Sequence, residues 1–256
     1  MYDVTKLVPI MVFKTLLKLL PTLRQRRRGR KRVAKEALLN GILQVLVNGV
    51  PWRKMALCGC SYGSCFRYFQ ELERRGKLKL VYQTLAKTST DLKDGSIDTT
   101  TIPSFEFERG VGWDGHDHVV GTKVSLFADR NGLPADVSFG KGNTFDRDFV
   151  KDHLKNTYGK RKKIINVDMR YMGLSFRREM RQKGIRVNMK TRDQDYTRKR
   201  GPKFKFDKEK YALRFLVERL NGWIQNFWRL RLRREYHLTS FKAFVYLALI
   251  IILIRR

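Results

Sequence analysis

The chain has 256 residues, of which 42% are apolar, and it carries 55 Lys and Arg against 24 Asp and Glu, a formal net charge of +31. This length holds one large domain, or a medium domain with a small one, and the apolar content supplies a core, which excludes a purely disordered polycation. Such a charge attracts polyanions, so the natural partners are nucleic acid and an anionic membrane surface, with a ribosome-like or chromatin-like structural protein as an alternative.

Two apolar segments resemble membrane spans but do not fit one. Residues 7–20 are interrupted by Lys14 and Lys18. Residues 241–254 are strongly apolar but shorter than the ~20 residues that a span needs. We therefore predict buried or oligomer-facing helices in both places and no membrane partner.

A basic run covers residues 22–35, with the sequence TLRQRRRGRKRVAK. Two interpretations stay open for it. It is either a solvated, mobile arm or an arm that contacts phosphates of a nucleic acid.

Three helical segments follow, and their short connections are typical of a helix-turn-helix domain. Apolar residues recur at helical spacing in residues 33–47, 61–75 and 78–87. Asn48-Gly49 and Gly76 are typical of helix ends, and Ser61 or Ser64 is typical of a helix cap. We predict a helical DNA-binding region at residues 1–88.

The second helix of this region would face DNA in such a domain. Its inward side chains are predicted to be Phe66, Phe69 and Leu72. Its outward side chains are predicted to be Arg67, Gln70 and Arg74. A small helical bundle with a charged outer face is the alternative for these residues.

The sequence pattern changes after Thr88, where predicted strands and helices alternate. Strands are predicted at residues 94–102, 118–128, 133–139, 163–168 and 185–190. Helices are predicted at 144–157, 172–183 and 208–230, and residues 191–207 are expected to be irregular. The turn Asp129-Arg130-Asn131-Gly132 is a strong hairpin signal. Three antiparallel strands followed by helix, strand, helix, strand and helix predict a ribonuclease-H-like α/β domain at residues 89–256.

Two acids lie on strands that this fold makes neighbours. Asp98 lies in the first strand, and Asp168 ends the fourth. Carboxylates on adjacent strands that point to one face would repel each other unless a divalent cation lay between them. Mg²⁺ suits such a site, because it binds one or two carboxylates and keeps waters for a substrate phosphate.

A third acid lies on the last predicted helix. At 100° per residue, one face of this helix is apolar, made of Leu213, Leu216, Leu220, Trp223, Ile224 and Phe227. A second face is polar, made of Tyr211, Arg214, Glu218, Asn221 and Gln225. For this segment alone, Arg214 and Glu218 are more simply an exposed ion pair that stabilises the helix by a few tenths of a kcal/mol.

Several motifs in order resemble a known family. YALRFLVE at 211–218 resembles the Y-x2-R-x3-E signature around the catalytic glutamate of DDE transposases of the bacterial and archaeal insertion-sequence-four and insertion-sequence-five groups. SIDTTTI resembles their first-aspartate motif, and NVDMRYMG resembles their motif of an aspartate and, three residues later, a tyrosine, here Tyr171. GKGNTFD resembles the segment between them, and GVPWRKM and FRYFQELERRG resemble the helical N-terminal region. The likeness covers roughly residues 35–250.

The resemblance implies a function and a site. It implies an insertion-sequence transposase that binds transposon ends and catalyses metal-dependent strand cleavage and strand transfer. Asp98, Asp168 and Glu218 would hold Mg²⁺, with Mn²⁺ as a substitute, and Arg214 and Tyr211 would act beside Glu218. The partner would be double-stranded DNA, both transposon ends and target, bound by a homodimer in a prokaryotic cytoplasm, at the nucleoid.

The chain departs from the family pattern, and other functions stay open. Gln225 stands where the family has a lysine, with the next basic residue at Arg229, and DMRYMG lacks the small residue that commonly precedes the tyrosine. A ribonuclease-H-like nuclease without strand transfer would use the same site. A non-catalytic DNA-binding descendant is opposed by the intact triad.

Overall fold

The computed structural model describes residues 7–22, 31–55, 59–105, 108–157, 159, 161–171, 174–190 and 206–256. The chain forms two compact units. The first joins residues 1–85 to residues 102–111 and 223–256, and the second joins residues 86–101 to residues 112–222. Parts of the predicted basic run, of the predicted helix at 172–183 and of the predicted irregular stretch at 191–207 lie outside the described residues.

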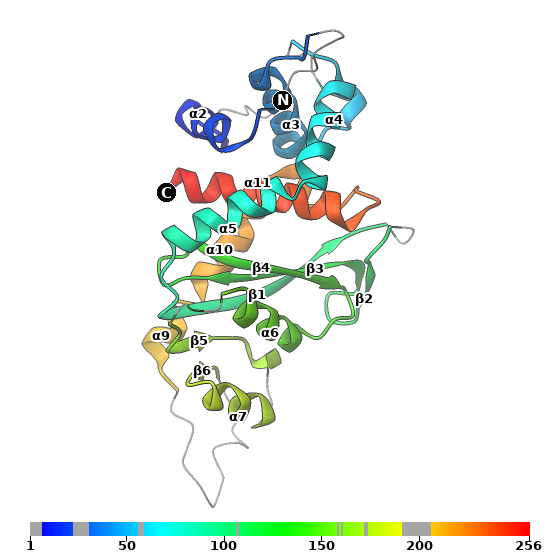
Figure 1. The fold of residues 1–256 in the computed structure, drawn as a ribbon. Coiled ribbons are helices and arrows are strands. Elements are labelled where there is room, and N and C mark those ends of the chain that lie inside the picture. Colours follow the sequence, from blue (N-terminus) through cyan, green and yellow to red (C-terminus); the bar gives the residue numbers. More distant parts are fainter. Residues whose placement is uncertain are drawn as a thin grey trace, which may run out of the picture. The chain divides into compact units, whose positions relative to one another are not determined.

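Helices make up most of the first unit (Figure 1). They are α2 (Ile10–Leu19), α3 (Lys35–Asn48), η1 (Trp52–Lys54), α4 (Tyr62–Arg74), most of α5 (Lys77–Ser89), η3 (Trp228–Leu230) and α11 (Leu238–Arg255). Local chemistry sets their ends: Ser61 caps α4 by accepting the N–H of Ser64, and Gly49 ends α3 in a left-handed conformation with φ of 65°. The N-terminal helices predicted from periodicity are confirmed.

One inward side chain of α4 was predicted wrongly. Phe69 and Leu72 are buried as expected, whereas Phe66 is 37% exposed. The ring of Phe66 meets the edge of Trp52 at a centroid distance of 5.3 Å. It therefore lies at the rim of the core, where one side of the ring contacts Trp52 and the other is open to solvent.

The C-terminal helix α11 packs against α2 and α4 in the first unit. By length and composition, among the described residues it is the helix that could cross a membrane, yet 61% of its apolar window is buried within the protein. It is the buried helix that residues 241–254 predicted. The predicted boundary at residue 88 groups α11 with the sheet, whereas its contacts group it with the N-terminal helices. The functions assigned to the two predicted domains stay predictions.

Buried charges join the separate segments of the first unit. Arg233 is fully buried, and its Nε lies 3.6 Å from Oε2 of Glu108. Arg229 donates from Nε to Oε1 of Glu235 across 2.6 Å. Removing one partner from such a pair leaves a buried charge without compensation, so the contact of Arg233 with Glu108 strongly fixes the segment 102–111 to the segment 223–256, in which Arg229 and Glu235 both lie.

Within the described residues, six strands of the second unit form one sheet. They are β1 (Asp94–Pro103), β2 (Gly112–Asp114), β3 (Val119–Ala128), β4 (Pro134–Lys141), β5 (Ile164–Asn166) and β6 (Arg186–Asn188). The order is β2-β3-β1-β5-β6, with β4 also paired to β3. β3 is antiparallel to β2 and β4, while β5 is parallel to β1 and to β6. This is the ribonuclease-H-like order, so the predicted fold class is confirmed.

Local signals account for most of this sheet. The turn between β3 and β4 forms where it was predicted, because Oδ1 of Asp129 accepts the N–H groups of Asn131 and Leu133, and Gly132 has a φ of 81°. Strand β2 was not predicted. It has only three residues and pairs with the first residues of β3, next to the stretch that pairs with β4.

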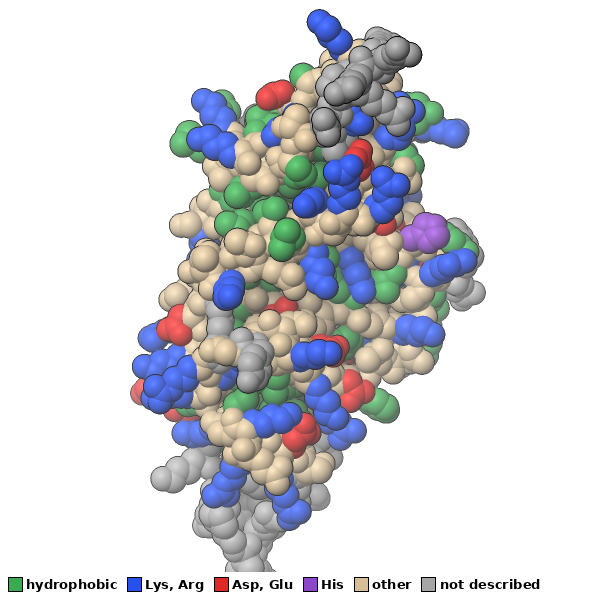
Figure 2. Space-filling view, in the orientation of Figure 1, with side chains coloured by type: hydrophobic (Ala, Val, Ile, Leu, Met, Phe, Trp, Pro, Cys, Tyr) green, Lys and Arg blue, Asp and Glu red, His purple; other side chains and the backbone are tan. Residues whose placement is uncertain are grey.

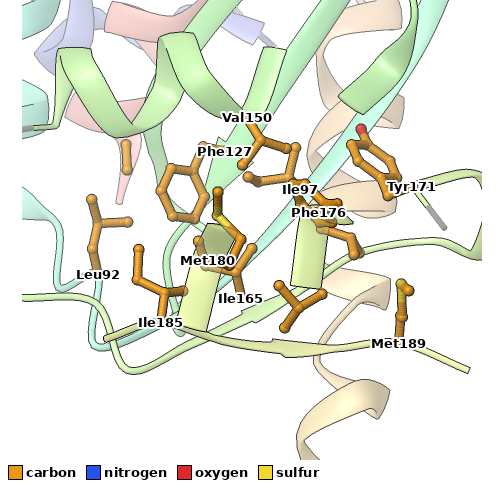
Figure 3. Close-up of a cluster of buried hydrophobic side chains, with 13 residues drawn as sticks. Leu92, Ile97, Phe127, Val150, Ile165, Tyr171, Phe176, Met180, Ile185 and Met189 are labelled. Atoms are coloured by element: carbon orange, nitrogen blue, oxygen red, sulfur yellow. The ribbon is translucent and has the colours of Figure 1, made fainter. Parts of the chain in front are cut away.

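A cluster of buried apolar side chains lies between this sheet and helices α6 (Asp146–Asn156) and α7 (Leu174–Gln182) (Figure 3). Ile97 of β1 and Val167, just after β5, are both fully buried in it. Side chains alternate between the faces of an extended chain, so Asp98 and Asp168, which follow these two residues, point away from the cluster. The core thereby fixes both acids.

The long helix predicted at 208–230 is interrupted, so this prediction was wrong in part. It consists of α9 (Lys208–Ala212), α10 (Phe215–Gln225) and the separate η3. Between α9 and α10 the backbone makes tighter bonds, with the N–H of Arg214 donating to the carbonyl of Tyr211 across 2.9 Å. This tighter turn changes the directions in which the neighbouring side chains point, compared with a continuous α-helix.

Candidate active site

The two aspartates lie at equivalent places on neighbouring strands. β1 and β5 are parallel, and Ser96 is paired with Asn166. Asp98 and Asp168 each lie two residues beyond this pair. The same strand direction therefore brings both carboxylates to the same end of the sheet, as the sequence predicted.

Arg214 connects Asp168 with the glutamate of α10. Its Nη1 lies 3.0 Å from Oδ1 of Asp168. Its Nε donates to Oε1 of Glu218 across 3.1 Å, and its Nη2 donates to the same oxygen. The Arg214 side chain is only 17% exposed, against 50% for Glu218. The pair is therefore more than the exposed helix contact that the segment alone suggested.

Tyr211 lies beside this arginine. The guanidinium carbon of Arg214 is 5.9 Å from the centre of the Tyr211 ring, and Nζ of Lys190 is 5.7 Å from it. The aromatic face favours cations at this range. Tyr211, Arg214 and Glu218 thus lie together, with Tyr211 in contact with cationic groups.

The electrostatics show that the acids influence one another. The pKa of Asp98 is raised to about 6, chiefly by burial; the charges of Glu218 and Asp168 contribute to the rise, while those of Arg214 and Arg170 oppose it. Burial alone would lower the pKa of Arg214, but the hydrogen bond with Glu218 and the charges of Asp98 and Asp168 raise it above its ordinary value. The guanidinium therefore stays charged among the carboxylates.

Asn221 was on the predicted polar face but was not predicted as a site residue. Its Nδ2 donates to Oδ2 of Asp98 across 2.8 Å. The side chain is 8% exposed, and its Oδ1 is buried without a hydrogen-bond partner among the described residues. Its spacing of three residues from Glu218 places both on one side of α10, and that spacing is the signal that could have found it.

Arg170 is a second residue of the site that was not predicted from the sequence. Its Nε lies 3.4 Å from Oδ2 of Asp168, and its Nη1 lies 4.0 Å from Oδ2 of Asp146. Asp146 in turn accepts from Nζ of the nearly buried Lys123 across 2.9 Å. Asp146 is the acid of the GKGNTFD segment, so this motif reaches Asp168 through Arg170.

A buried Ser-His-Asp arrangement lies in the same unit but is not a nucleophilic site. Oγ of Ser125 lies 3.0 Å from Nε2 of His153, and Nδ1 of His153 lies 2.7 Å from Oδ2 of Asp136. Ser125 and His153 are fully buried and Asp136 is 5% exposed. A substrate cannot reach the serine, so this group satisfies polar atoms inside the fold.

The donor set of the acid site fits a divalent cation. Carboxylate and carbonyl oxygens, together with water, are ligands that suit Mg²⁺ and Mn²⁺. The buried acceptor Oδ1 of Asn221 and the raised pKa of Asp98 are both features that a nearby cation would relieve. As they stand, no three His, Cys, Asp or Glu side chains of the described residues are grouped closely enough to hold an ion. Instead, the positive guanidinium of Arg214 contacts both Asp168 and Glu218 and balances their charge.

The residues that depart from the family pattern lie further along. Gln225 is exposed, and its backbone carbonyl accepts from Nε of Arg231 across 2.7 Å. Arg229 is 6% exposed, bonded to Glu235 and placed 5.6 Å from the centre of the Phe244 ring. Arg229 is therefore a structural residue and is poorly placed to replace the family lysine.

The predicted DNA-facing side chains of α4 are accessible. Arg67, Gln70 and Arg74 are all exposed. They follow one another at spacings of three and four residues, so they lie on one side of the helix. Their contact with DNA stays a prediction.

Two solved structures were found to be similar. The piggyBac transposase in a synaptic complex with hairpin DNA is 12% identical, with a TM-score of 0.39, and the match covers 78% of this chain and 50% of that one. The Mos1 transposase in a paired-end complex with the left transposon end is 9% identical, with a TM-score of 0.26, and the match covers 82% of this chain and 79% of that one. The chain thus spans half the length of the piggyBac chain.

Family comparisons are more informative. No curated protein matches the chain. Residues 12–82 match a family described as "Putative transposase of IS4/5 family". Residues 89–254, most of the chain, match the family described as "Transposase DDE domain", and this confirms the resemblance seen in the motifs. The chain therefore belongs to the DDE transposases of the IS4/5 group.

Proposed function

We propose that the protein is an insertion-sequence transposase that binds transposon ends, cleaves DNA strands and joins them to a target. Asp98, Asp168 and Glu218 are its acidic triad. The observation that carries the proposal is the position of Arg214: its guanidinium contacts both Asp168 and Glu218, and its charge and those of the two acids act on Asp98.

Asp98, Asp168 and Glu218 are the residues that would hold Mg²⁺ or Mn²⁺. When bound, the metal would activate water or a DNA 3′-hydroxyl and stabilise the leaving oxygen. The chain itself supplies rigidity, because Ile97 and Val167 anchor the two aspartates in the core. Arg214 supplies a planar donor group that can turn from the acids to a phosphate.

DNA is the partner that the charge supports. Lys and Arg side chains are spread over the face shown in Figure 2, with far fewer acids among them. The exposed Arg67 and Arg74 of α4 are suited to phosphate or base contacts. We propose a homodimer assembled on the transposon ends, acting at the nucleoid of a prokaryotic cell.

The test is strand cleavage of a linear duplex that carries the ends of the encoding element. With Mg²⁺ or Mn²⁺ we expect cut and joined products, and with a chelator neither. Asp168→Asn should abolish cleavage and bind DNA as tightly as the wild type or more tightly, because a negative charge near phosphate is removed. Asp152→Asn, which makes the same charge change at an exposed position of α6, is the control. Wild-type cleavage by Asp168→Asn would overturn the proposal.

Pre-cut ends separate the transposase from its alternatives. A transposase joins a pre-cut end to target DNA, whereas a nuclease with the same site cuts but leaves pre-cut ends unjoined. A non-catalytic DNA-binding descendant would bind the ends and do neither.

A further inference from the structure

We infer that Asn221 is a positioning residue of the acid site: it holds Asp98 by one carboxylate oxygen and presents its own amide oxygen to the water or cation that the site takes up. The inference rests on the proposed function and deepens it, since it adds a fourth oxygen-bearing side chain to the three acids.

The burial of this amide is the first observation. Asn221 is 8% exposed, and its neighbours on α10 include Val217 and Leu220, which are fully buried. A polar amide in such a place costs free energy unless its atoms are hydrogen-bonded. An apolar side chain would be the ordinary choice for packing alone.

The direction of the hydrogen bond is the second observation. Nδ2 of Asn221 donates to Oδ2 of Asp98 across 2.8 Å. An ionised carboxylate only accepts, so the amide nitrogen must be the atom that faces it. Oδ2 of Asp98 is thereby fixed by the amide of Asn221. Oδ1 of Asp98 is left for other partners.

The third observation is the remaining amide oxygen. Oδ1 of Asn221 is buried and has no hydrogen-bond partner among the described residues. Buried acceptors of this kind are rare in folded proteins and call for a partner such as an ordered water or an ion. This oxygen belongs to the side chain that holds Asp98, so a water or cation beside Asp98 is the partner that would satisfy it.

A purely structural role makes a different prediction. If Asn221 only satisfied a buried carboxylate, its loss would lower stability and leave cation affinity unchanged. If it positions Asp98, its loss must weaken cation binding. Substitutions of groups that orient metal ligands typically cost about 10–100-fold in metal affinity or activity.

The experiment measures Mn²⁺ binding to the DNA-free protein by electron paramagnetic resonance, with thermal unfolding measured on the same samples. Asn221→Ala should weaken Mn²⁺ binding by about 10-fold or more. Asn221→Leu, which keeps the number and branching of the side-chain heavy atoms but has no polar atom, should do the same and guards against a folding failure of the alanine variant. In cleavage assays, both should need more Mn²⁺ to reach half of their maximal rate.

The matched control is Ser240→Ala. Oγ of Ser240 also donates to a carboxylate across 2.8 Å, that of Glu73 in the first unit. It should lower stability without changing Mn²⁺ affinity. Wild-type Mn²⁺ affinity in a folded Asn221 variant would overturn the inference. If the wild type does not bind Mn²⁺, or Asp168→Asn binds it equally well, the proposed function fails instead.

Discussion

At the scale of single residues, Tyr171 connects the backbone segments that carry the two aspartates. Its hydroxyl shares a hydrogen bond of 2.9 Å with Oγ1 of Thr99, the residue after Asp98. Tyr171 itself follows Asp168 by three residues in the 3₁₀ turn η2 (Met169–Tyr171) and is 1% exposed. The tyrosine of the NVDMRYMG motif therefore ties the turn that carries one acid to the strand that carries the other.

Tyr171→Phe tests this tie. It keeps the ring in the core and removes the hydroxyl that bonds to Thr99, so unfolding should become easier by about 1 kcal/mol. Cleavage at saturating DNA should also slow, because the two acids lose a shared support. Tyr68→Phe is the control, since that buried hydroxyl donates across 2.8 Å to the carbonyl of Pro21. A similar stability loss without slower cleavage is expected there, and equal cleavage rates in both variants would count against the tie.

Arg214 is the second residue whose role the structure changes. As an exposed helix pair with Glu218 it would affect stability very little. Its low exposure and its contact with Asp168 make it instead the counter-charge of the whole acid site. Removing it leaves three carboxylates with mutual repulsion.

Arg214→Met should therefore destabilise the metal-free protein by about 1–2 kcal/mol, between the values for exposed and for buried pairs. Added Mg²⁺ should raise its melting temperature more than that of the wild type, because the ion no longer competes with a guanidinium. Strand joining should fall. Lys183→Met, which breaks the exposed 2.9 Å pair with Glu179, should change stability, the response to Mg²⁺ and strand joining very little. An unchanged melting temperature in Arg214→Met would restore the exposed-pair interpretation.

At the scale of elements, glycines at two helix ends have matched conformations in different surroundings. Gly49 follows α3 with φ of 65°, and Gly76 follows α4 with φ of 60°. A Cβ at Gly49 would lie 3.1 Å from Cβ of Trp228, whereas a Cβ at Gly76 would meet open space.

Alanine should therefore lower the free energy of unfolding by different amounts at the two positions. Each substitution places a side chain in the left-handed region, at roughly 1–2 kcal/mol. Gly49→Ala must also displace Trp228, so urea denaturation should show it to be the less stable variant. Equal midpoints would mean that Trp228 moves without cost.

Element boundaries were predictable where local chemistry decides them. The Asp129 turn and the caps of α3 and α4 depend on a few adjacent residues, and they form as predicted. The break before α10 was not predictable, because no proline or glycine marks it. Strand β2 was missed because three residues show no clear alternation.

The site was predictable in part for the same reason. Parallel neighbouring strands bring their ends together, so the closeness of Asp98 and Asp168 followed from the fold pattern. The contact of Arg214 with Asp168 joins residues far apart in sequence and needed the packed structure. The burial of Asn221 likewise depends on tertiary packing, since a helical wheel places it on the polar face.

At the scale of the whole molecule, several acidic side chains are paired with basic ones inside the fold. Asp114 and Asp146 lie against Lys123, and Glu235 lies against Arg229. These pairs are close to neutral, so they leave the excess of Lys and Arg, a net charge of +31 over the chain, available to a polyanion. Salt should control DNA affinity, because each phosphate contact releases counterions.

The basic run provides the sharpest test of this field. Residues 22–32 contain seven Lys and Arg residues. Each of these that contacts a phosphate contributes a slope of about −0.9 to log K against log salt, so replacing the segment should flatten the slope by up to about 6. A neutral Gly/Ser segment of the same length keeps the connection and removes only the charge, and the slope is measured by titrating labelled duplex at several salt concentrations. A solvated arm would leave the slope unchanged, since distant charges are screened at these salt concentrations. The size of the change thus counts the phosphates that the arm contacts.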